Sequence, residues 1–195
     1  VHDIGDGVMC IEFTSKSNSI GEGIGHGIDQ AIKMAEEEGW KGIVIGNNAK
    51  QFSVGANLMN VGMLAMQKQF DTLDTVIEGF QNLNMRIRTS KIPVVVATQG
   101  YVFGGGCEIA MHCDAGIYAA ESYIGLPEVG VGLLPAGGGV KELALRASNK
   151  FFEGDVKIPT LLDHFKTIAT ATISTSAHEA YNLGFLEEGR DHVCC

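Results

Sequence analysis

Short apolar runs alternate along the chain with longer segments in which apolar residues recur every three or four positions. The short runs predict buried strands, and the periodic segments predict helices with one apolar face. The predicted strands are residues 8–13, 42–46, 92–97 and 115–119. The predicted helices are residues 28–37, 62–88, 104–112 and, after a glycine-rich start, 136–147. This alternation is typical of an α/β fold built from parallel β-α-β units.

Three segments add detail to this pattern. Residues 42–46 are wholly apolar, which is typical of a strand buried on both faces of a sheet. The glycine-rich residues 21–27 predict a flexible entry to the helix that follows them. Residues 150–175 have no regular period and form an atypical insertion or connection. They are either a packed surface connection, which the sequence favours, or a lid or docking segment.

Length and charge narrow the class of protein. The 195 residues are enough for one domain. With 14 Lys and Arg against 23 Asp and Glu, the formal net charge is −9. A strongly acidic chain repels nucleic acid and anionic lipid, so we expect neither as a partner. A small polyanion held by a few local donors is compatible with this charge.

The cysteines indicate the cellular compartment of the protein, and the histidines indicate whether it binds a metal ion. The five cysteines are odd in number and contain no C-x-x-C pair, which predicts reduced thiols in a cytoplasmic protein. The six histidines form no H-x-x-x-H or H-E-x-x-H pattern, so we expect no metal site. No apolar run reaches the ~18 residues that span a bilayer, so we expect no membrane span.

The glycine-rich loops do not match nucleotide-binding patterns. A G-x-G-x-x-G motif that starts at Gly21 requires glycine where the chain has His26. One that starts at Gly23 requires glycine where the chain has Ile28. No G-x-x-x-x-G-K-[ST] loop occurs either. These loops therefore predict no nucleotide site, and we expect no permanently bound cofactor.

Two glycine-containing turns carry the candidate chemistry. Residues 51–58 follow the predicted strand at 42–46, and residues 99–108 follow the one at 92–97. Such turns aim backbone N–H groups at one point, and two N–H donors form an oxyanion hole. If Gly105 lies in the first turn of its helix, its N–H has no intrahelical partner and sits at the positive end of the helix dipole. A developing negative oxygen would be stabilised there.

Two glutamates accompany these turns. Glu108 follows Gly105 by three residues, which places it one helical turn on and on the same face. Glu128 follows Pro127 among apolar residues and glycine, an unusual place for a solvated charge. Two carboxyls in one poorly solvated pocket have pKa values that are pushed apart, which supplies one acid and one base near neutral pH. The alternative is structural, with glycines for close packing, a glutamate at a helix start and a loop glutamate.

Residues 15–20, 42–58 and 92–145 resemble the crotonase, or enoyl-CoA hydratase/isomerase, superfamily. The most specific part is the stretch PVVVATQGYVFGGGCEIAMHCDAGIYAAESYIGLPEVGVGLLPAGGG. The resemblance implies a crotonase-like β-β-α spiral with two near-perpendicular sheets surrounded by helices. It implies an enoyl-CoA hydratase of fatty-acid β-oxidation, a hydro-lyase that adds water across the 2,3 double bond of a 2-enoyl-CoA thioester to give 3-hydroxyacyl-CoA.

The functional residues of the family correspond by position to residues of this chain. The resemblance implies that the N–H groups of Ala56 and Gly105 hold the thioester oxygen. It also implies that Glu108 and Glu128 are the two catalytic glutamates. The residues expected to contact the acyl-CoA are Ser17, Ser19, Ile20, Ser53, Gly55, Ala56, Asn57, Leu58, Phe103, Gly104, Gly105, Pro127 and Glu128. Coenzyme A would enter only as part of the substrate.

Several alternatives stay open. A Δ3-Δ2 isomerase or another crotonase reaction would use the same pocket differently, and a non-catalytic acyl-CoA-binding domain would use it only to bind. Asn57 stands where the family usually has an acidic residue, which leaves the backbone donor in place. Lys16 and Lys50 are candidates for the CoA phosphates, or ordinary solvated lysines. Phe103 and residues 63–80 are candidates for the wall of the acyl pocket.

The resemblance also bears on domain organisation. The chain resembles the hydratase part of a multifunctional β-oxidation protein that carries a fused 3-hydroxyacyl-CoA dehydrogenase. We therefore expect one crotonase-like domain over residues 1–195, truncated at its C-terminus. Its expected partner is either a second and third copy in a homo-trimer or the fused dehydrogenase domain.

Overall fold

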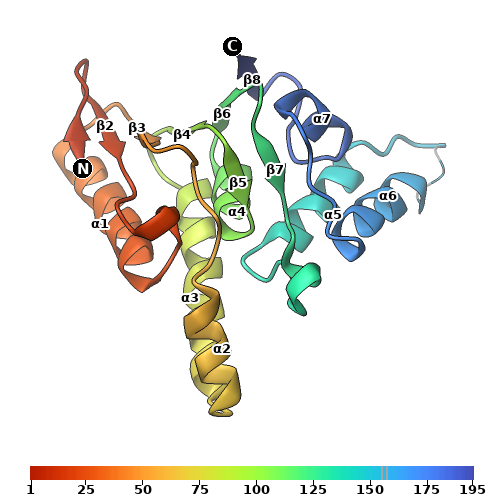
Figure 1. The fold of residues 1–195 in the computed structure, drawn as a ribbon. Coiled ribbons are helices and arrows are strands. Elements are labelled where there is room, and N and C mark those ends of the chain that lie inside the picture. Colours follow the sequence, from red (N-terminus) through yellow and green to blue (C-terminus); the bar gives the residue numbers. More distant parts are fainter. Residues whose placement is uncertain (155, 157) are drawn as a thin grey trace.

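The computed structural model describes residues 1–154, 156 and 158–195 and shows a mixed α/β architecture (Figure 1). A six-stranded sheet has the order β1-β2-β3-β4-β6-β8, in which only β1 is antiparallel to its neighbour. These strands are His2–Asp3, Val8–Ile11, Gly42–Ile45, Val94–Thr98, Ala115–Ala119 and Asp191–Cys194. A second sheet pairs β5 (Tyr101–Phe103) with β7 (Tyr123–Gly125) in parallel.

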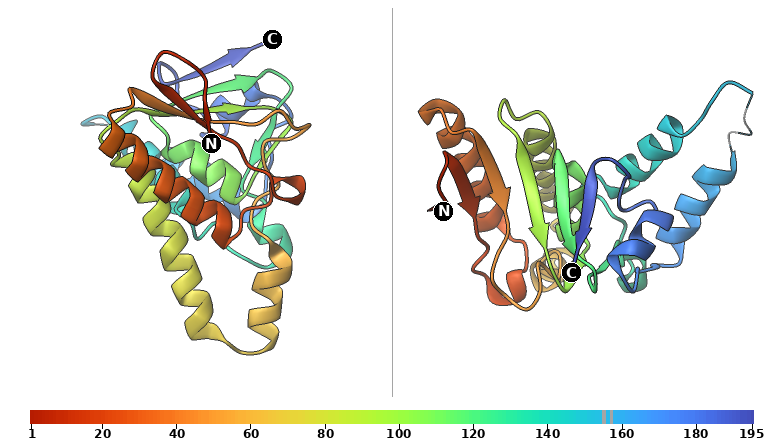
Figure 2. Two further views of the ribbon diagram at one scale, coloured as in Figure 1. Left: turned by 90° about the vertical axis from the view of Figure 1, so that its left-hand side faces the viewer. Right: turned by 90° about the horizontal axis from the view of Figure 1, so that it is seen from above.

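Helices α1, α3 and α4 lie on one face of the large sheet (Figure 2). The helices are α1 Glu22–Glu38, α2 Leu58–Met66, α3 Phe70–Arg88, α4 Gly105–His112, α5 Gly139–Asn149, α6 Ile158–Ala169 and α7 Ala177–Asn182, with short 3₁₀ helices η1 Lys16–Asn18 and η2 Glu128–Val131. The predicted α/β class, the four predicted strands and the helix at 104–112 are confirmed. None of the helices in the described part of the chain combines the length and apolar character of a membrane span.

The large sheet is fully buried on one face only. Along β4, buried Val94, Val96 and Thr98 alternate with half-buried Val95 and Ala97. In β3 only Val44 is half-buried, so the prediction that residues 42–46 are buried on both faces is met except at Val44.

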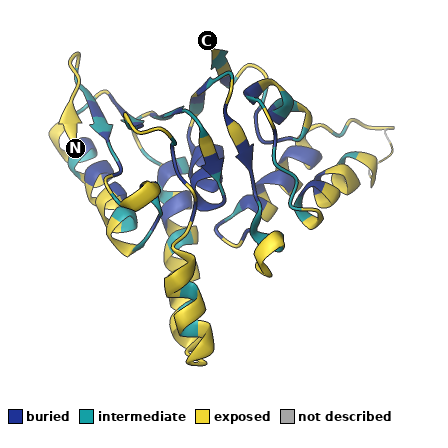
Figure 3. Ribbon diagram, viewed as in Figure 1, coloured by how far each residue is buried: buried dark blue, intermediate teal, exposed yellow. Residues whose placement is uncertain are grey.

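The predicted helix at 62–88 is two helices. Helices α2 and α3 form a hairpin that projects from the body of the protein (Figure 1). The chain turns at residues 67–69, where Lys68 has a left-handed φ of 55°. No residue of α2 is buried, and most of the hairpin is exposed in Figure 3. The single-helix prediction is wrong because the apolar spacing continues through the turn.

Two further expectations about local structure are wrong. The glycine-rich residues 22–27 belong to α1, because the helix is held by four buried residues, Ile28, Ala31, Ile32 and Ala35. Residues 150–175 contain α6, so this segment is not irregular throughout. Helix α6 contacts α5 through His164, whose Nδ1 lies 2.8 Å from the Leu143 carbonyl oxygen. This contact favours a packed connection over a free lid.

Candidate active site

Hydrogen bonds bring together the two loops expected to contact the substrate. The N–H of Ile20 donates to the Gly55 carbonyl at 2.8 Å, and the N–H of Asn57 donates to the Ile20 carbonyl at 3.1 Å. Ser53, which is fully buried, donates from Oγ to the Asn18 carbonyl at 2.7 Å. The predicted residues at 17–20 and 53–58 therefore form one surface, with Ser53 supporting it from inside.

The N–H groups of Ala56 and Gly105 have no acceptor in the described part of the chain. Ile20 and Ala56 are partners in a parallel β-bridge, whose two hydrogen bonds use the Gly55 carbonyl and the Asn57 N–H. The N–H of Ala56 itself therefore points away from Ile20. Gly105 is the first residue of α4, where the N–H has no intrahelical partner. A Cβ on Gly55 would lie 3.4 Å from the Gly105 nitrogen, so the two loops are in contact. Two unpaired donors on adjacent loops are what an oxyanion hole requires.

Gly104 brings the second carboxyl to this loop. Its φ of 52° and ψ of −124° are favoured only by glycine. A Cβ at this position would lie 2.9 Å from Glu128 Oε1. Gly104 also donates its N–H to the Gly125 carbonyl at 2.9 Å, which ties the start of α4 to β7. The Glu128 carboxyl therefore lies directly against the backbone that precedes Gly105.

Glu108 lies in α4 and is only 3% exposed. Its Oε1 accepts a hydrogen bond from the N–H of Gly139 at 2.8 Å. Gly139 is the first residue of α5, so the carboxylate caps that helix in place of a capping side chain at Gly138. Burial raises the pKa of Glu108 to about 7, and the charge on Glu128 adds to this rise. The amides of residues 137–139 act in the opposite direction.

Glu128 begins η2 and is half-buried. Its Oε2 is a buried atom with no hydrogen-bond partner among the described residues. Burial raises the pKa of Glu128 to about 7 as well. Burial therefore raises both pKa values alike, so the two environments do not by themselves separate them, and any separation comes from the interaction between the two carboxyls. The charge on Glu128 raises the pKa of Glu108, so ionisation of one carboxyl disfavours ionisation of the other.

The glycines at 137–139 contact Glu108 and were not among the predicted site residues, whereas Phe80 lies in the segment predicted to form the wall of the acyl pocket. A Cβ on Gly105 would lie 3.1 Å from the Phe80 ring. A Cβ on Gly137 would overlap both the Phe80 ring and Glu108 Oε2. The ring therefore lies beside Gly105 and beside the contact of Gly137 with Glu108. The signal for these glycines was a triple glycine before a helix, the same signal that marked residues 104–106.

The remaining predicted residues are placed as follows. Phe103 stacks its ring on Tyr101 at a centroid distance of 4.8 Å, and Ser19 and Pro127 are half-buried. The exposed ones are Ser17, Ala56, Asn57 and Leu58, together with the candidate phosphate ligands Lys16 and Lys50. Within the described residues, no group of three or more His, Cys, Asp or Glu could hold a metal ion.

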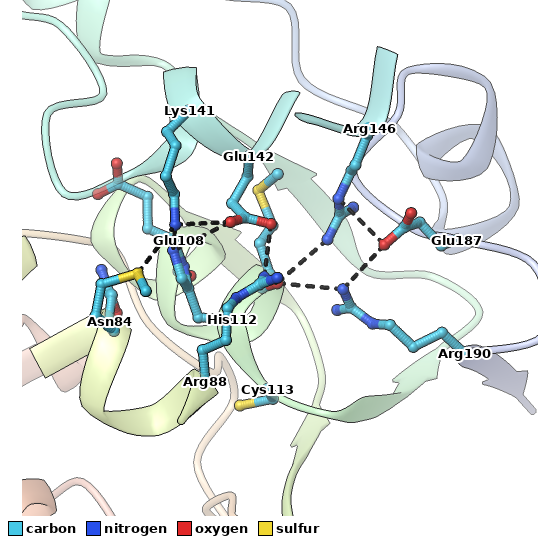
Figure 4. A network of polar contacts seen from close by, with 12 residues as sticks. Asn84, Arg88, Glu108, His112, Cys113, Lys141, Glu142, Arg146, Glu187 and Arg190 are labelled. Carbon is cyan, nitrogen blue, oxygen red and sulfur yellow. Dashed lines mark hydrogen bonds and ion pairs between the residues drawn. The ribbon is translucent and has the colours of Figure 1, made fainter. Parts of the chain in front are cut away.

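Three arginines gather at the other end of α4 (Figure 4). The Met111 carbonyl accepts hydrogen bonds from Arg88 at 2.9 Å, from Arg146 at 3.3 Å and from Arg190 at 3.1 Å. This carbonyl belongs to the last turn of the helix, which is the negative end of the helix dipole. The guanidinium groups therefore hold α4 in place at the end opposite to Gly105.

Comparisons with known proteins agree with this geometry. The profile of the enoyl-CoA hydratase/isomerase family matches residues 3–154. This chain belongs to that family. The match ends within the residues that precede α6.

Relatives and solved structures extend the comparison. A probable 3-hydroxyacyl-CoA dehydrogenase of Bacillus subtilis is 42% identical over 186 residues, 95% of this chain and 23% of that protein. A mitochondrial enoyl-CoA hydratase of Pongo abelii is 34% identical over 139 residues, 70% of this chain and 46% of that protein. The crystal structure of an enoyl-CoA hydratase from Bacillus anthracis superposes with a TM-score of 0.78 at 21% identity, over 99% of this chain and 68% of that one. The structural likeness confirms the crotonase fold, and the chain spans less than half the length of these two relatives.

Proposed function

We propose that this chain is an enoyl-CoA hydratase, which adds water to a 2-enoyl-CoA thioester. The observation that carries the proposal is that the buried Glu108 and the half-buried Glu128 both lie beside the first turn of α4, where the N–H group of Gly105 is unpaired. A water molecule held between two carboxyls that share one proton meets a base and an acid at once. Family membership and the names of several relatives support the same reaction.

The reaction divides between the backbone and the carboxyls. The N–H groups of Ala56 and Gly105 would bind the thioester oxygen and stabilise the negative charge that develops on it. The ionised carboxyl takes a proton as the water oxygen bonds to C3, and the electron pair of the double bond moves toward the thioester. The protonated carboxyl then gives its proton to C2. The product is a 3-hydroxyacyl-CoA, and the pair again holds one proton.

Hydration of crotonyl-CoA tests this proposal, followed as loss of the conjugated thioester absorbance. We expect Glu108→Gln and Glu128→Gln each to lower kcat by about 10²–10⁴-fold, because each removes one proton-transfer group. The exposed residue Glu121 lies in the loop before β7, and Glu121→Gln is the matched control. The assay is run on this chain and on any longer natural protein that contains it.

Other outcomes point to other reactions in the same pocket. Loss of activity in Glu108→Gln alone would indicate a one-carboxyl reaction, and conversion of 3-enoyl-CoA would then identify a Δ3-Δ2 isomerase. CoA binding without turnover in every form of the wild type would indicate a binding domain. Full activity in both glutamine variants would contradict the proposed mechanism.

We further propose how the chain meets its substrate and partners. Coenzyme A would enter as part of the substrate, with its phosphates near the exposed Lys16 and Lys50. The B. subtilis relative supports a fused 3-hydroxyacyl-CoA dehydrogenase as partner, since that enzyme class consumes the product of hydration. A homo-trimer is the alternative assembly, which light scattering would test. The five free thiols support a reducing, cytoplasmic location.

A further inference from the structure

Two polar side chains of α3 hold the glycine loop that faces Glu108. Asn84 Nδ2 donates to the Gly137 carbonyl at 2.8 Å, and Gln81 Nε2 donates to the Ala136 carbonyl at 2.7 Å. The two donors are three residues apart, which places them on one face of the helix. Asn84 is fully buried, and its Oδ1 has no partner among the described residues. The bond to Gly137 is therefore the one hydrogen bond that this buried side-chain amide makes among the described residues, and leaving such a group unpaired is costly.

Each of these carbonyls belongs to a peptide unit whose N–H group acts on Glu108. In a trans peptide the C=O and the N–H point in opposite directions, and the described residues contain no cis peptide. The Ala136 carbonyl shares its unit with the N–H of Gly137, and the Gly137 carbonyl shares its unit with the N–H of Gly138. The N–H groups of Gly137 and Gly138, together with that of Gly139, stabilise the carboxylate.

Glycine peptide units need such an anchor. Without a Cβ, residues 137–139 have access to conformations in which a unit turns over and presents its carbonyl oxygen to the carboxylate. Gly138 has a φ of 128°, and a Cβ there would lie 2.7 Å from His112 Cε1, so the histidine ring closes the loop from the other side. The hydrogen bond from Asn84 forms only in the orientation in which the Gly137 carbonyl faces α3.

We propose that Asn84, with Gln81 beside it, is a positioning residue for Glu108. Asn84 fixes the peptide unit between Gly137 and Gly138, and Gln81 fixes the one between Ala136 and Gly137, so that the N–H groups, and not the carbonyl oxygens, face the carboxylate. The expected change in the pH profile of kcat/KM rests on the proposed hydratase function, while the expected change in the pKa of Glu108 does not.

The effect of Asn84 on the pKa of Glu108 can be distinguished from the effect of a changed charge, because the charged groups near Glu108 lie on other elements. The titratable groups near it are Glu128 of η2, Cys107 and His112 of α4, and Lys141 and Glu142 of α5. Lys141 and Glu142 pair with each other at 2.8 Å beside His112, and Glu128 acts on the pKa of Glu108. From α3, Phe80 and Asn84 are uncharged. Substitution of Asn84 by alanine therefore changes no charge.

The test compares Asn84→Ala with Asn82→Ala, an exposed asparagine on the same helix. Two readouts are used: the acid limb of the pH profile of kcat/KM on crotonyl-CoA, and the ¹³C-carboxyl titration of Glu108, assigned by its absence in Glu108→Gln. We expect Asn84→Ala to move both upward by about one pH unit, the size expected for a lost hydrogen bond to a charged group. Gln81→Ala should shift them less and in the same direction, and Asn82→Ala should leave them unchanged.

The outcomes separate the two proposals. An unshifted Glu108 titration in folded Asn84→Ala would overturn the positioning role, and so would lower activity with an unchanged pH profile. If Asn84→Ala does not fold, Gln81→Ala tests the positioning role instead. Gln81 is exposed, so its substitution leaves no buried polar group without a hydrogen-bond partner. If the wild type does not hydrate crotonyl-CoA, the proposed function fails while the carboxyl titration still decides the role of Asn84.

Discussion

The carboxylate of Glu108 and the N–H of Gly139 meet at 2.8 Å across 31 residues of chain. This one contact ties α4, which carries the predicted oxyanion donor Gly105, to the first residue of α5. A carboxyl that we propose to transfer protons thus also serves as a helix cap. Chemistry and packing are coupled at this point, and several consequences can be measured.

Glu128→Gln should make the protein more stable at alkaline pH. The pKa of Glu128 is about 7 in the fold against an ordinary value of 4.5, so the folded state binds the proton more tightly. The resulting stability is fully present below pH 4.5 and is lost as the pH rises through 7. Glutamine does not ionise, so the variant should exceed the wild type by about 1–3 kcal/mol at pH 8.

Urea unfolding at pH 5 and pH 8 measures this difference. Glu121→Gln is the control, because Glu121 is exposed. A free energy of unfolding that changes equally with pH in wild type and Glu128→Gln would show that this carboxyl is not held in its protonated form.

Gly104→Ala should abolish activity and destabilise the fold. A Cβ would lie 2.9 Å from Glu128 Oε1, and the φ of 52° with ψ of −124° strains any other residue, at a cost of about 1–3 kcal/mol. Gly79→Ala is the contrast, because Gly79 is exposed in α3 with no atom within 4 Å of its would-be Cβ. That change should stabilise the helix by up to ~1 kcal/mol. Thermal unfolding and the hydration assay compare the two, and an active Gly104→Ala enzyme would refute the close approach.

Arg146→Met should destabilise the protein strongly. The guanidinium, whose side chain is 2% exposed, donates to the carbonyls of Gly184 and Phe185 and pairs with Glu187 at 3.3 Å (Figure 4). Its removal leaves buried acceptors unsatisfied, at a cost on the order of 3 kcal/mol. Lys166→Met breaks a surface pair, with 70% exposure of the lysine side chain, and should change stability by less than about 0.5 kcal/mol. Equal losses in chemical denaturation would contradict the buried network.

Four of the five cysteines should fall into two reactivity classes, with the half-buried Cys10 outside both. Cys107 and Cys113 are buried, and burial raises the pKa of the Cys113 thiol to about 12 and that of Cys107 further. Cys194 and Cys195 are exposed. Because the thiolate is the reactive form, iodoacetamide at pH 8 should label the exposed pair first. Mass spectrometry of the alkylated protein reads this out, and early labelling of Cys107 would mean that α4 opens in the native state.

Local patterns were enough for much of the fold and for part of the site. Strand periodicity placed β2, β3, β4 and β6, and the glycine turn before residue 105 placed α4. The spacing from Gly105 to Glu108 then followed from the helix itself, since both lie on one turn. These features depend on neighbours in sequence, which a reader of the sequence can see.

Only the tertiary structure decided how distant segments complete the site. The contact of Glu128 with Gly104, the amides of residues 137–139 on Glu108, and the bond from Asn84 to Gly137 all join parts of the chain that are 20 or more residues apart. The division of residues 62–88 into two helices and the half-buried face of the large sheet could not be predicted from the apolar pattern either. Apolar spacing records which residues avoid water, whereas the partner that covers them, and the burial that sets a pKa, depend on how the elements are packed.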